Sequence, residues 1–180
     1  TQQWTPVREW SAEAAKVSPE AAAVLGFTGS LTRFLLRRFG MALALHVHEQ
    51  TLDRCQPGEA ELLDCRVGDH CLRRRVSLLH RRTVMFDAES VLPLEWLPTE
   101  MMQDLQDGKK PLGNLLLDWG LSLSRSDLSI ASIQLSEQSR SDYRWARRSV
   151  LRSPSGTRAL IIESFHPEIW IRLKGLRRGQ

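Results

Sequence analysis

The sequence predicts an α+β fold in which a single six-stranded, mostly antiparallel sheet has its apolar face covered by helices. Two observations lead to this prediction. From about residue 41 onward, apolar residues recur mainly with a period of two, and short turn-forming segments join several of these stretches. Before and between them lie segments with helical periodicity. Strands in hairpin-like succession, with helices before and between them, are typical of α+β domains.

Three helices are expected ahead of the first strand, at 11–16, 19–25 and 31–39. Ser11 and Ser30 are placed to cap the first and third helices, and Pro19 suits the start of the second. Gly40 is placed to end the third helix. We therefore expect a helical N-terminal part that leads directly into the sheet.

Six strands are expected, at 41–52, 71–79, 83–92, 128–135, 145–152 and 158–165. The polar segment 80–82 predicts a hairpin between the second and third strands, and Ser-Pro-Ser-Gly at 153–156 predicts one between the last two. Residues 56–58, Gln-Pro-Gly, are expected to form a turn. Between the third and fourth strands, helices are expected at 98–105 and 112–119.

Composition indicates one folded domain over residues 1–180. Hydrophobic residues make up 42% of the chain and charged residues 26%, which excludes general disorder. No apolar run approaches the roughly 20 residues of a membrane span, and residues 1–10 do not resemble a signal peptide. We therefore expect a cytoplasmic protein. A monomer is expected because nothing in the sequence suggests obligate assembly, and the basic tail, about 174–180, is expected to be frayed. The net charge of +4 suits anionic small molecules as well as nucleic acid.

The three cysteines, Cys55, Cys65 and Cys71, are expected to be reduced thiols, because their number is odd and no export signal is present. His70 and His80 lie near them in sequence. No C-x-x-C pair occurs, so no metal site is expected.

Arg74 interrupts the apolar pattern of the second expected strand. Strict alternation puts it on the same face as Leu72, Val76 and Leu78, while the arginines on either side of it point the other way. A buried guanidinium keeps its proton and needs an anion. A structural ion pair, a bulge that turns the side chain outward, and a bound ligand would each satisfy it.

Glu163 interrupts the last expected strand in the same way, on the face of Ala159, Ile161 and Phe165. An apolar setting raises the pKa of a carboxyl, which makes Glu163 a candidate acid or base. Two interpretations remain open. Glu163 either pairs with Arg74 across the sheet, or both line a cavity for a small ligand with a carboxylate at one end and a hydroxyl at the other.

Other polar residues are weaker candidates. His46 and His48 are expected to be exposed strand histidines, and the arginine pairs at 81–82 and 147–148 to be solvated basic surface. Nucleic-acid surfaces usually interleave aromatic residues for stacking, and the chain has one tyrosine. No Gly-rich phosphate loop, G-x-S-x-G or H-E-x-x-H motif occurs.

Six short motifs resemble, in the same order, those of the chorismate lyase (chorismate–pyruvate lyase) family. They are Ser30-Leu-Thr-Arg33, Arg74-Arg-Val76-x-Leu78, Ser90-Val-Leu-Pro93, Lys110-Pro-Leu-Gly113, Trp145-Ala-Arg-Arg-Ser149, and Ile162-Glu-Ser-Phe165 followed by Pro167. Each motif alone is weak, but six in the right order are fairly specific.

The resemblance implies a lyase that converts chorismate to 4-hydroxybenzoate and pyruvate, the first committed step of ubiquinone biosynthesis, with no metal and no cofactor. It also implies a six-stranded sheet and a product buried beneath helical flaps. The family's carboxylate-binding arginine falls on Arg74, assisted by the backbone amide of Leu112. Its hydroxyl-binding glutamate falls on Glu163, and a flap contact on that hydroxyl falls on Leu31. Arg74 and Glu163 would be the catalytic residues.

One position departs from the family pattern. Glu89 stands where the family usually has an arginine, which is associated with the second carboxylate of the substrate, on its enolpyruvyl arm. Alternation points Glu89 away from the apolar face of its strand. Either another cation, such as Arg81, Arg125 or Arg147, takes this role, or turnover is impaired.

Two other functions remain open. The same fold serves as the effector-binding domain of some bacterial transcription regulators, so the main alternative is a small-aromatic-acid binding module without efficient lyase activity. The segment before the first expected strand is too short for the winged-helix domain that those regulators carry. A basic RNA-associated protein would instead bind RNA with strong salt dependence; no nucleic-acid partner is expected here.

Overall fold

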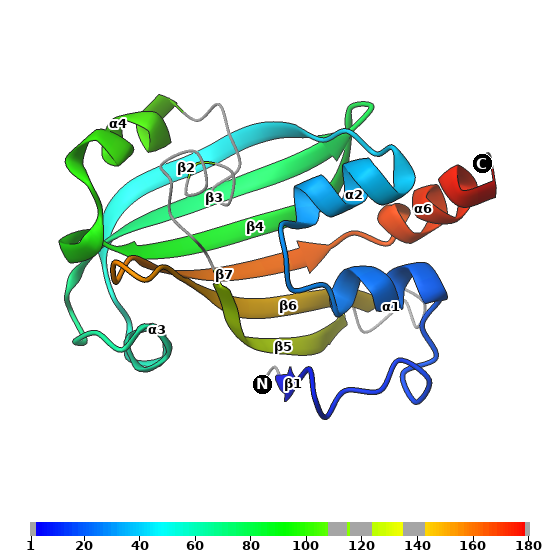
Figure 1. Ribbon diagram of the computed structural model, residues 1–180, viewed down its shortest axis with the longest axis horizontal. Helices are drawn as coiled ribbons and strands as arrows, with labels where there is room; N and C mark the ends of the chain where they lie inside the picture. Colours follow the sequence, from blue (N-terminus) through cyan, green and yellow to red (C-terminus); the bar gives the residue numbers. More distant parts are fainter. Residues whose placement is uncertain (1–2, 108–114, 116–123, 135–142, 179–180) are drawn as a thin grey trace.

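The computed structural model describes residues 3–107, 115, 124–134 and 143–178. Its centre is an antiparallel sheet of seven strands in the order β1-β5-β6-β7-β4-β3-β2 (Figure 1). The expected antiparallel α+β architecture is confirmed, but the expected number of six strands is wrong. The additional strand is β1 (Thr5–Pro6), which pairs with β5 at the sheet edge. Two residues are too few to show an alternating pattern in the sequence.

The six longer strands lie close to their expected positions. They are β2 (Ala44–Arg54), β3 (His70–His80), β4 (Thr83–Pro93), β5 (Ser124–Gln134), β6 (Tyr143–Arg152) and β7 (Arg158–Phe165). Strands β2–β3–β4 and β5–β6–β7 are two meanders of consecutive strands. The pairing of β4 with β7 joins the meanders, and we call this ladder the seam.

Both expected hairpin turns are confirmed. The β3–β4 turn has Arg81 and Arg82 at its centre, with φ of 48° and 68°. Positive φ at both central residues matches the twist of the flanking strands. The β6–β7 turn is closed by Gly156 at φ 95°, a conformation that glycine adopts at little cost.

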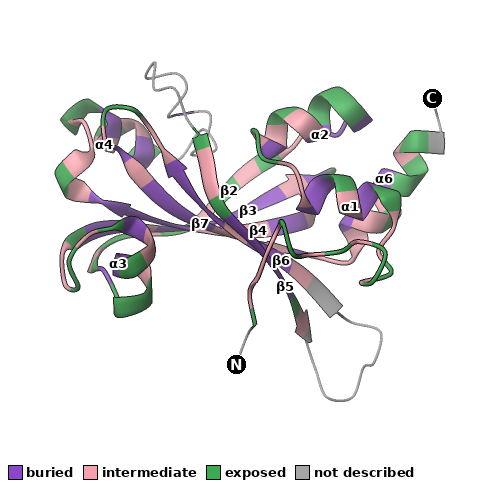
Figure 2. Ribbon diagram, turned by 60° about the horizontal axis from the view of Figure 1, so that its bottom comes forward, coloured by how far each residue is buried: buried purple, intermediate pink, exposed green. Residues whose placement is uncertain are grey.

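Helices cover both faces of the sheet (Figure 2). On one side, here called the cavity face, lie α1 (Pro19–Leu25), α2 (Leu31–Phe39), α4 (Thr99–Asp107) and α6 (Glu168–Arg178). On the opposite face lies α3 (Pro57–Leu63), and a short 3-10 helix, η1 (Leu94–Trp96), connects β4 to α4. The expected helices at 19–25, 31–39 and 98–105 are confirmed. The helix expected at 112–119 lies outside the described residues, except for Leu115, which is helical and buried.

Three local expectations are wrong. Residues 12–16 form turns and not a helix, because Lys16 has a φ of 54° and the Ser11 hydroxyl caps only the amide of Ala14. The Gln-Pro-Gly segment begins α3, with Pro57 at the position in the first turn where the missing N–H costs nothing. The C-terminal segment is helix α6 as far as residue 178 and not a frayed tail from 174.

Each face of the sheet has its own core. Helices α1, α2 and α6 pack on one end of the cavity face and α4 on the other, while α3 covers a core that contains Cys55 and Cys71 on the opposite face. Helix α6 belongs to the first core because Ile169 and Leu173, one turn apart, are fully buried there. No helix within the described ranges is long and apolar enough to cross a bilayer.

Candidate functional site

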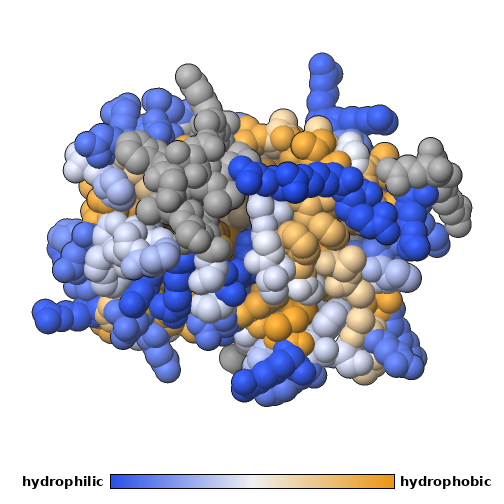
Figure 3. All heavy atoms as spheres, in the orientation of Figure 1, coloured by the Kyte–Doolittle hydropathy of each residue, from blue (hydrophilic) through white to orange (hydrophobic). Residues whose placement is uncertain are grey.

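A cavity of about 70 Å³ lies on the cavity face under the N-terminal end of α2. Its polar lining is Ser30, Thr32, Arg74, Ser90, Arg125 and Glu163, and its apolar lining is Leu31, Leu45, Val76, Leu78, Phe86, Ala88, Leu151 and Ile161. One water needs roughly 10–15 Å³, so the cavity has room for several waters or a small ring. The outer surface over α2 is strongly hydrophilic and borders an apolar area towards α1 (Figure 3).

Arg74 lies in this cavity, as alternation along β3 predicts. Its side chain is almost completely buried. Burial lowers the pKa of the guanidinium, but an arginine remains protonated in a protein. Arg74 therefore supplies a fixed positive charge to an otherwise largely apolar wall.

Glu163 also lies in the cavity, on β7. In the sheet, Arg74 is opposite Ser90, Ser90 is opposite Ile161, and Glu163 is two residues further along β7. Two strand spacings and two residues along a strand place the Cα atoms of Arg74 and Glu163 about 12 Å apart. Both side chains line the cavity, and the charges that act on the pKa of Glu163 are those of Arg147 and Arg125 and not that of Arg74.

The structure gives Glu163 a different ion-pair partner, Arg147, which is opposite it in the β6–β7 ladder. Arg147 donates from Nε to Oε2 of Glu163 and from Nη2 to Oε1 at 3.4 Å. Its Nη1 donates to the carbonyl oxygens of Val24 at 3.0 Å and Phe27 at 2.6 Å. Arg147 therefore connects the sheet to the end of α1 and to the segment before α2.

The expectation that the arginine pair 147–148 is solvated surface is wrong. Arg147 is fully buried on the cavity face. Arg148 points to the opposite face, where its guanidinium lies 4.7 Å from the centre of the Trp4 ring. Two adjacent arginines are typical of a solvated surface. Because side chains alternate along β6, however, Arg147 and Arg148 point to opposite faces of the sheet. The pair at 81–82 is exposed in its turn, as expected.

The expectation of a raised pKa for Glu163 is also wrong. Burial acts to raise the pKa of this carboxyl, but the charges of Arg147 and Arg125 outweigh burial and hold the pKa below its usual value. Glu163 is therefore ionised at neutral pH and accepts hydrogen bonds.

Arg125 reaches the same end of the cavity from β5. Its Nη1 lies 3.9 Å from Oε2 of Glu163 and donates to Ser149 Oγ at 2.5 Å. The β5–β6 ladder contains a bulge between Ser126 and Ser129, with Asp127 at φ 53°. The extra residue reverses the alternation, so that Arg125 faces the cavity although plain alternation from the far end of β5 would turn it away.

One expected site residue, Leu31, lies on the cover of the cavity. Leu31, the first residue of α2, is buried and lines the cavity wall. Gly40 ends that helix in a left-handed conformation, which supports the predicted extent of the segment. Leu112 lies outside the described residues.

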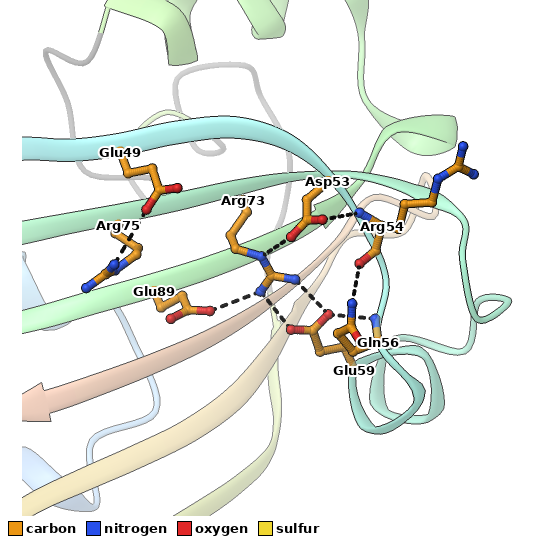
Figure 4. Close-up of polar contacts among 8 residues, drawn as sticks. All are labelled: Glu49, Asp53, Arg54, Gln56, Glu59, Arg73, Arg75 and Glu89. Atoms are coloured by element: carbon orange, nitrogen blue, oxygen red, sulfur yellow. Dashed lines mark hydrogen bonds and ion pairs between the residues drawn. The ribbon is translucent and has the colours of Figure 1, made fainter.

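Glu89 points away from the cavity, as alternation predicts. On the opposite face it accepts a hydrogen bond of 3.0 Å from Arg73, which also contacts Asp53 at 2.7 Å and Glu59 at 2.7 and 3.1 Å (Figure 4). We call these four residues the Arg73 cluster. The three carboxylates raise the pKa of Arg73, with the hydrogen bonds of Glu59 contributing most.

The remaining candidates lie away from the cavity. His46 and His48 are exposed, and the His48 ring bonds Ser77 at 2.6 Å. All three cysteines are free, and burial raises the pKa of Cys55 to about 11 and that of Cys65 to about 12. Within the described ranges, no three His, Cys, Asp or Glu side chains are arranged to hold a metal ion.

A cavity lined by arginines and a carboxylate, between an antiparallel sheet and a helix, is typical of a small-molecule-binding domain. Its fold is similar to the effector domain of PhnF from Mycobacterium smegmatis, with 13% identity and a TM-score of 0.61 over 78% of this chain and 90% of that chain. It is also similar to a GntR-family transcriptional regulator from Bacillus cereus, with 15% identity and a TM-score of 0.55 over 70% and 92%. Identities this low show a shared fold alone.

The sequence itself identifies the family. The family model for chorismate lyase matches residues 5–174, so this chain belongs to the chorismate lyase family. The resemblance inferred from the six motifs is thereby confirmed. No curated protein sequence matches the chain.

Proposed function

We propose that the protein binds chorismate in this cavity and converts it to 4-hydroxybenzoate and pyruvate. The observation that carries the proposal is a cavity, in a chain of this family, whose wall contains both Arg74 and Glu163, with Cα atoms about 12 Å apart by the strand register. These two charges match a ring with a carboxylate and a hydroxyl at opposite positions. No metal or cofactor is required by this proposal.

Arg74 anchors the ring carboxylate through charge-assisted hydrogen bonds, with the backbone amide of Leu112 as the proposed second donor. The apolar residues around the ring keep water out, and the contact strengthens because the local dielectric is low. Orientation of the ring by these contacts supplies several kcal/mol towards the barrier.

Glu163, held ionised by Arg147, accepts a hydrogen bond from the ring hydroxyl. The reaction removes the hydrogen from the hydroxyl-bearing carbon and breaks the neighbouring C–O bond, so that the ring becomes aromatic. The departing enolpyruvate gains a proton and becomes pyruvate, which balances the reaction without water. In this proposal Glu163, an ionised carboxylate in the cavity wall, handles that proton.

The product satisfies the same two charges as the substrate and is therefore held tightly. Helix α2, which carries Leu31, is the proposed flap whose opening lets 4-hydroxybenzoate leave. Product release is then a slow step of the cycle.

A binding module without turnover is the second candidate, and the likeness to effector domains of regulators favours it. A spectroscopic assay separates the two. Incubation with chorismate should yield 4-hydroxybenzoate and pyruvate in equal amounts, and Arg74→Met should abolish this yield. Arg75→Met, on the exposed opposite face, is the matched control and should retain it. Tight binding of 4-hydroxybenzoate with no product from chorismate would establish the binding module.

A further inference from the structure

We infer that Arg125 binds a second carboxylate and thereby selects dicarboxylate ligands over monocarboxylates. The inference rests on the proposed function only for the identity of the natural ligand, since the binding preference itself requires no turnover.

Arg125 and Arg147 are both buried beside Glu163, but their donors are used differently. The Nε, Nη1 and Nη2 atoms of Arg147 all donate hydrogen bonds, to Glu163 and to two backbone carbonyls. Arg125 donates to Ser149, and more weakly to the carbonyl of Gly29 at 3.5 Å. Its Nε is buried and has no hydrogen-bond partner among the residues that the structure describes. A buried donor without a partner is costly, and a bound anion would remove that cost.

The charges at this end of the cavity lead to the same conclusion. The salt bridges recorded here involve one carboxylate, Glu163, and two guanidinium groups, Arg125 and Arg147. Burial lowers the pKa of Arg125, and Arg147 lowers it further while Glu163 raises it. Both guanidinium groups stay charged. Among the residues that the structure describes at this end of the cavity, positive charge therefore exceeds negative charge by one, and the side chain of Arg125 is only 6% exposed to solvent.

The position of Arg125 fits the second acid of chorismate. The enolpyruvyl ether is attached to the ring carbon next to the one that bears the hydroxyl. If Glu163 holds the hydroxyl, the second carboxylate lies at the Glu163 end of the cavity, where Arg125 is 3.9 Å from the carboxyl. Arg81 is in an exposed turn and Arg147 is already engaged, so among the three cations suggested by the sequence Arg125 fits this role.

The β5 bulge is the structural device that places this arginine. Removing the extra residue would restore plain alternation and turn Arg125 to the opposite face. The family arginine that Glu89 replaces on β4 is then not needed for the ligand, because Arg125 on β5 supplies the positive charge.

The test compares two stable ligands that differ in one acid. 4-Hydroxy-3-(carboxymethoxy)benzoate carries a carboxylate on an ether next to the hydroxyl, and 4-hydroxy-3-methoxybenzoate has the ether without it. Calorimetry on the full chain should show the dicarboxylate binding at least about tenfold more tightly. In Arg125→Gln this preference should fall to about threefold or less, and Arg125→Lys should restore part of it because the charge is retained. Arg75→Gln is the matched surface control and should leave the preference unchanged.

The result also separates this inference from the proposed lyase activity. Equal affinity of the wild type for both ligands, or equal loss of both in Arg125→Gln, would overturn the role of Arg125 even if chorismate is converted. A preference that disappears in Arg125→Gln, in a protein that forms no 4-hydroxybenzoate, would retain the inference and reject the lyase. If Arg125→Gln does not fold, Arg125→Met and Arg125→Ala replace it. An unchanged dicarboxylate preference in either variant would overturn the inference, and a lost preference would support it.

In an active enzyme, the KM for chorismate should rise in Arg125→Gln by about tenfold, with a much smaller change in the inhibition constant of 4-hydroxybenzoate.

Discussion

Adjacent arginines on β3 have opposite surroundings. Arg73, on the face covered by α3, is bonded by three carboxylates within 2.7 to 3.1 Å (Figure 4). Arg74, on the cavity face, is more deeply buried and lies in the wall of a cavity. At the far end of that cavity, Arg125 and Arg147 share the single carboxylate of Glu163.

The two faces therefore differ in their charge balance. On the opposite face, negative charge exceeds positive charge around Arg73, and the ions are partly exposed, so the cluster adds modest stability and requires no ligand. At the Glu163 end of the cavity, positive charge exceeds negative charge among the side chains that the structure describes, and these charges are buried. The same residue type thus serves the fold on one face and, by our proposal, an anionic ligand on the other.

The largest effect is expected from Arg147→Met. This change leaves Glu163 buried beside one more distant arginine and removes the donors to two carbonyls, so the free energy of unfolding should fall by about 3–5 kcal/mol. Arg148→Met, the neighbour on the opposite face, should cost far less. Urea unfolding of both variants measures the difference, and a loss of under about 1 kcal/mol in Arg147→Met would contradict a buried structural pair.

Arg74→Met should abolish tight binding of 4-hydroxybenzoate while the protein stays folded. Losing a charge-assisted contact in a buried site costs on the order of 2–5 kcal/mol of binding free energy. Arg73→Met is the sharpest control, because it removes the adjacent arginine from the other face. Calorimetric titration should show wild-type affinity in Arg73→Met, and wild-type affinity in Arg74→Met would reject the proposed carboxylate site.

The hydroxyl contact of Glu163 can be measured by ligand substitution. 4-Hydroxybenzoate should bind more tightly than benzoate by about 1.5–3 kcal/mol, the value of a hydrogen bond to a charged acceptor. Glu163→Gln should reduce this difference and slow turnover. Equal affinities for the two acids in the wild type would remove Glu163 from the ligand site and leave it as the partner of Arg147 alone.

The Arg73 cluster should make stability depend on acid pH. Burial acts to raise the pKa of Glu59, but its bonds to Arg73 and to the Gln56 amide hold the pKa below its usual value of 4.5. The pKa is depressed in the folded state, so the stabilisation is complete above 4.5 and is lost as pH falls through the lower folded value. Glu59→Gln should lower stability at pH 7 by about 1 kcal/mol. Urea unfolding should show the two proteins converging in acid, and a difference independent of pH would contradict the assignment.

The smallest effect is expected at Glu89. Glu89→Arg places a cation beside Arg73, and its cost should be below about 1 kcal/mol because the side chain is 42% exposed. The kcat/KM for chorismate should not change, since the residue points away from the cavity. A rise in kcat/KM would show that an arginine at this position reaches the substrate, and would weaken the role inferred for Arg125.

Sequence periodicity predicted the parts of the site that obey it. Arg74 and Glu163 lie on regular strands, so alternation placed both on the buried face. Arg125 could be named only as one of several cations, because its orientation depends on a bulge that pattern does not show. Local pattern cannot show that Arg147 is buried, because its partners, the carbonyls of Val24 and Phe27, are distant in sequence.

The same limits explain the errors in the fold. Helix α3 has seven residues and opens with Pro-Gly, which is also a turn signal. Helix α6 is basic, and only two of its described residues, Ile169 and Leu173, are fully buried in the core, with Trp170 and Leu176 partly buried beside them. Strand β1 pairs over two residues, and that pairing depends on a partner far along the chain.

The seam between the two meanders has a consequence for the order of folding. Arg74 belongs to the first meander, whereas Arg125, Arg147 and Glu163 belong to the second. Each meander forms by contacts between consecutive strands, but the seam and the bond from Arg147 to Phe27, 120 residues apart in sequence, require long-range closure. Long-range pairing is slow because the chain loses the entropy of loop closure before the new contacts contribute favourable free energy. A nascent chain released only as far as β4 would hold the β3–β4 hairpin without a binding site, so ligand affinity should appear in the last kinetic phase of refolding.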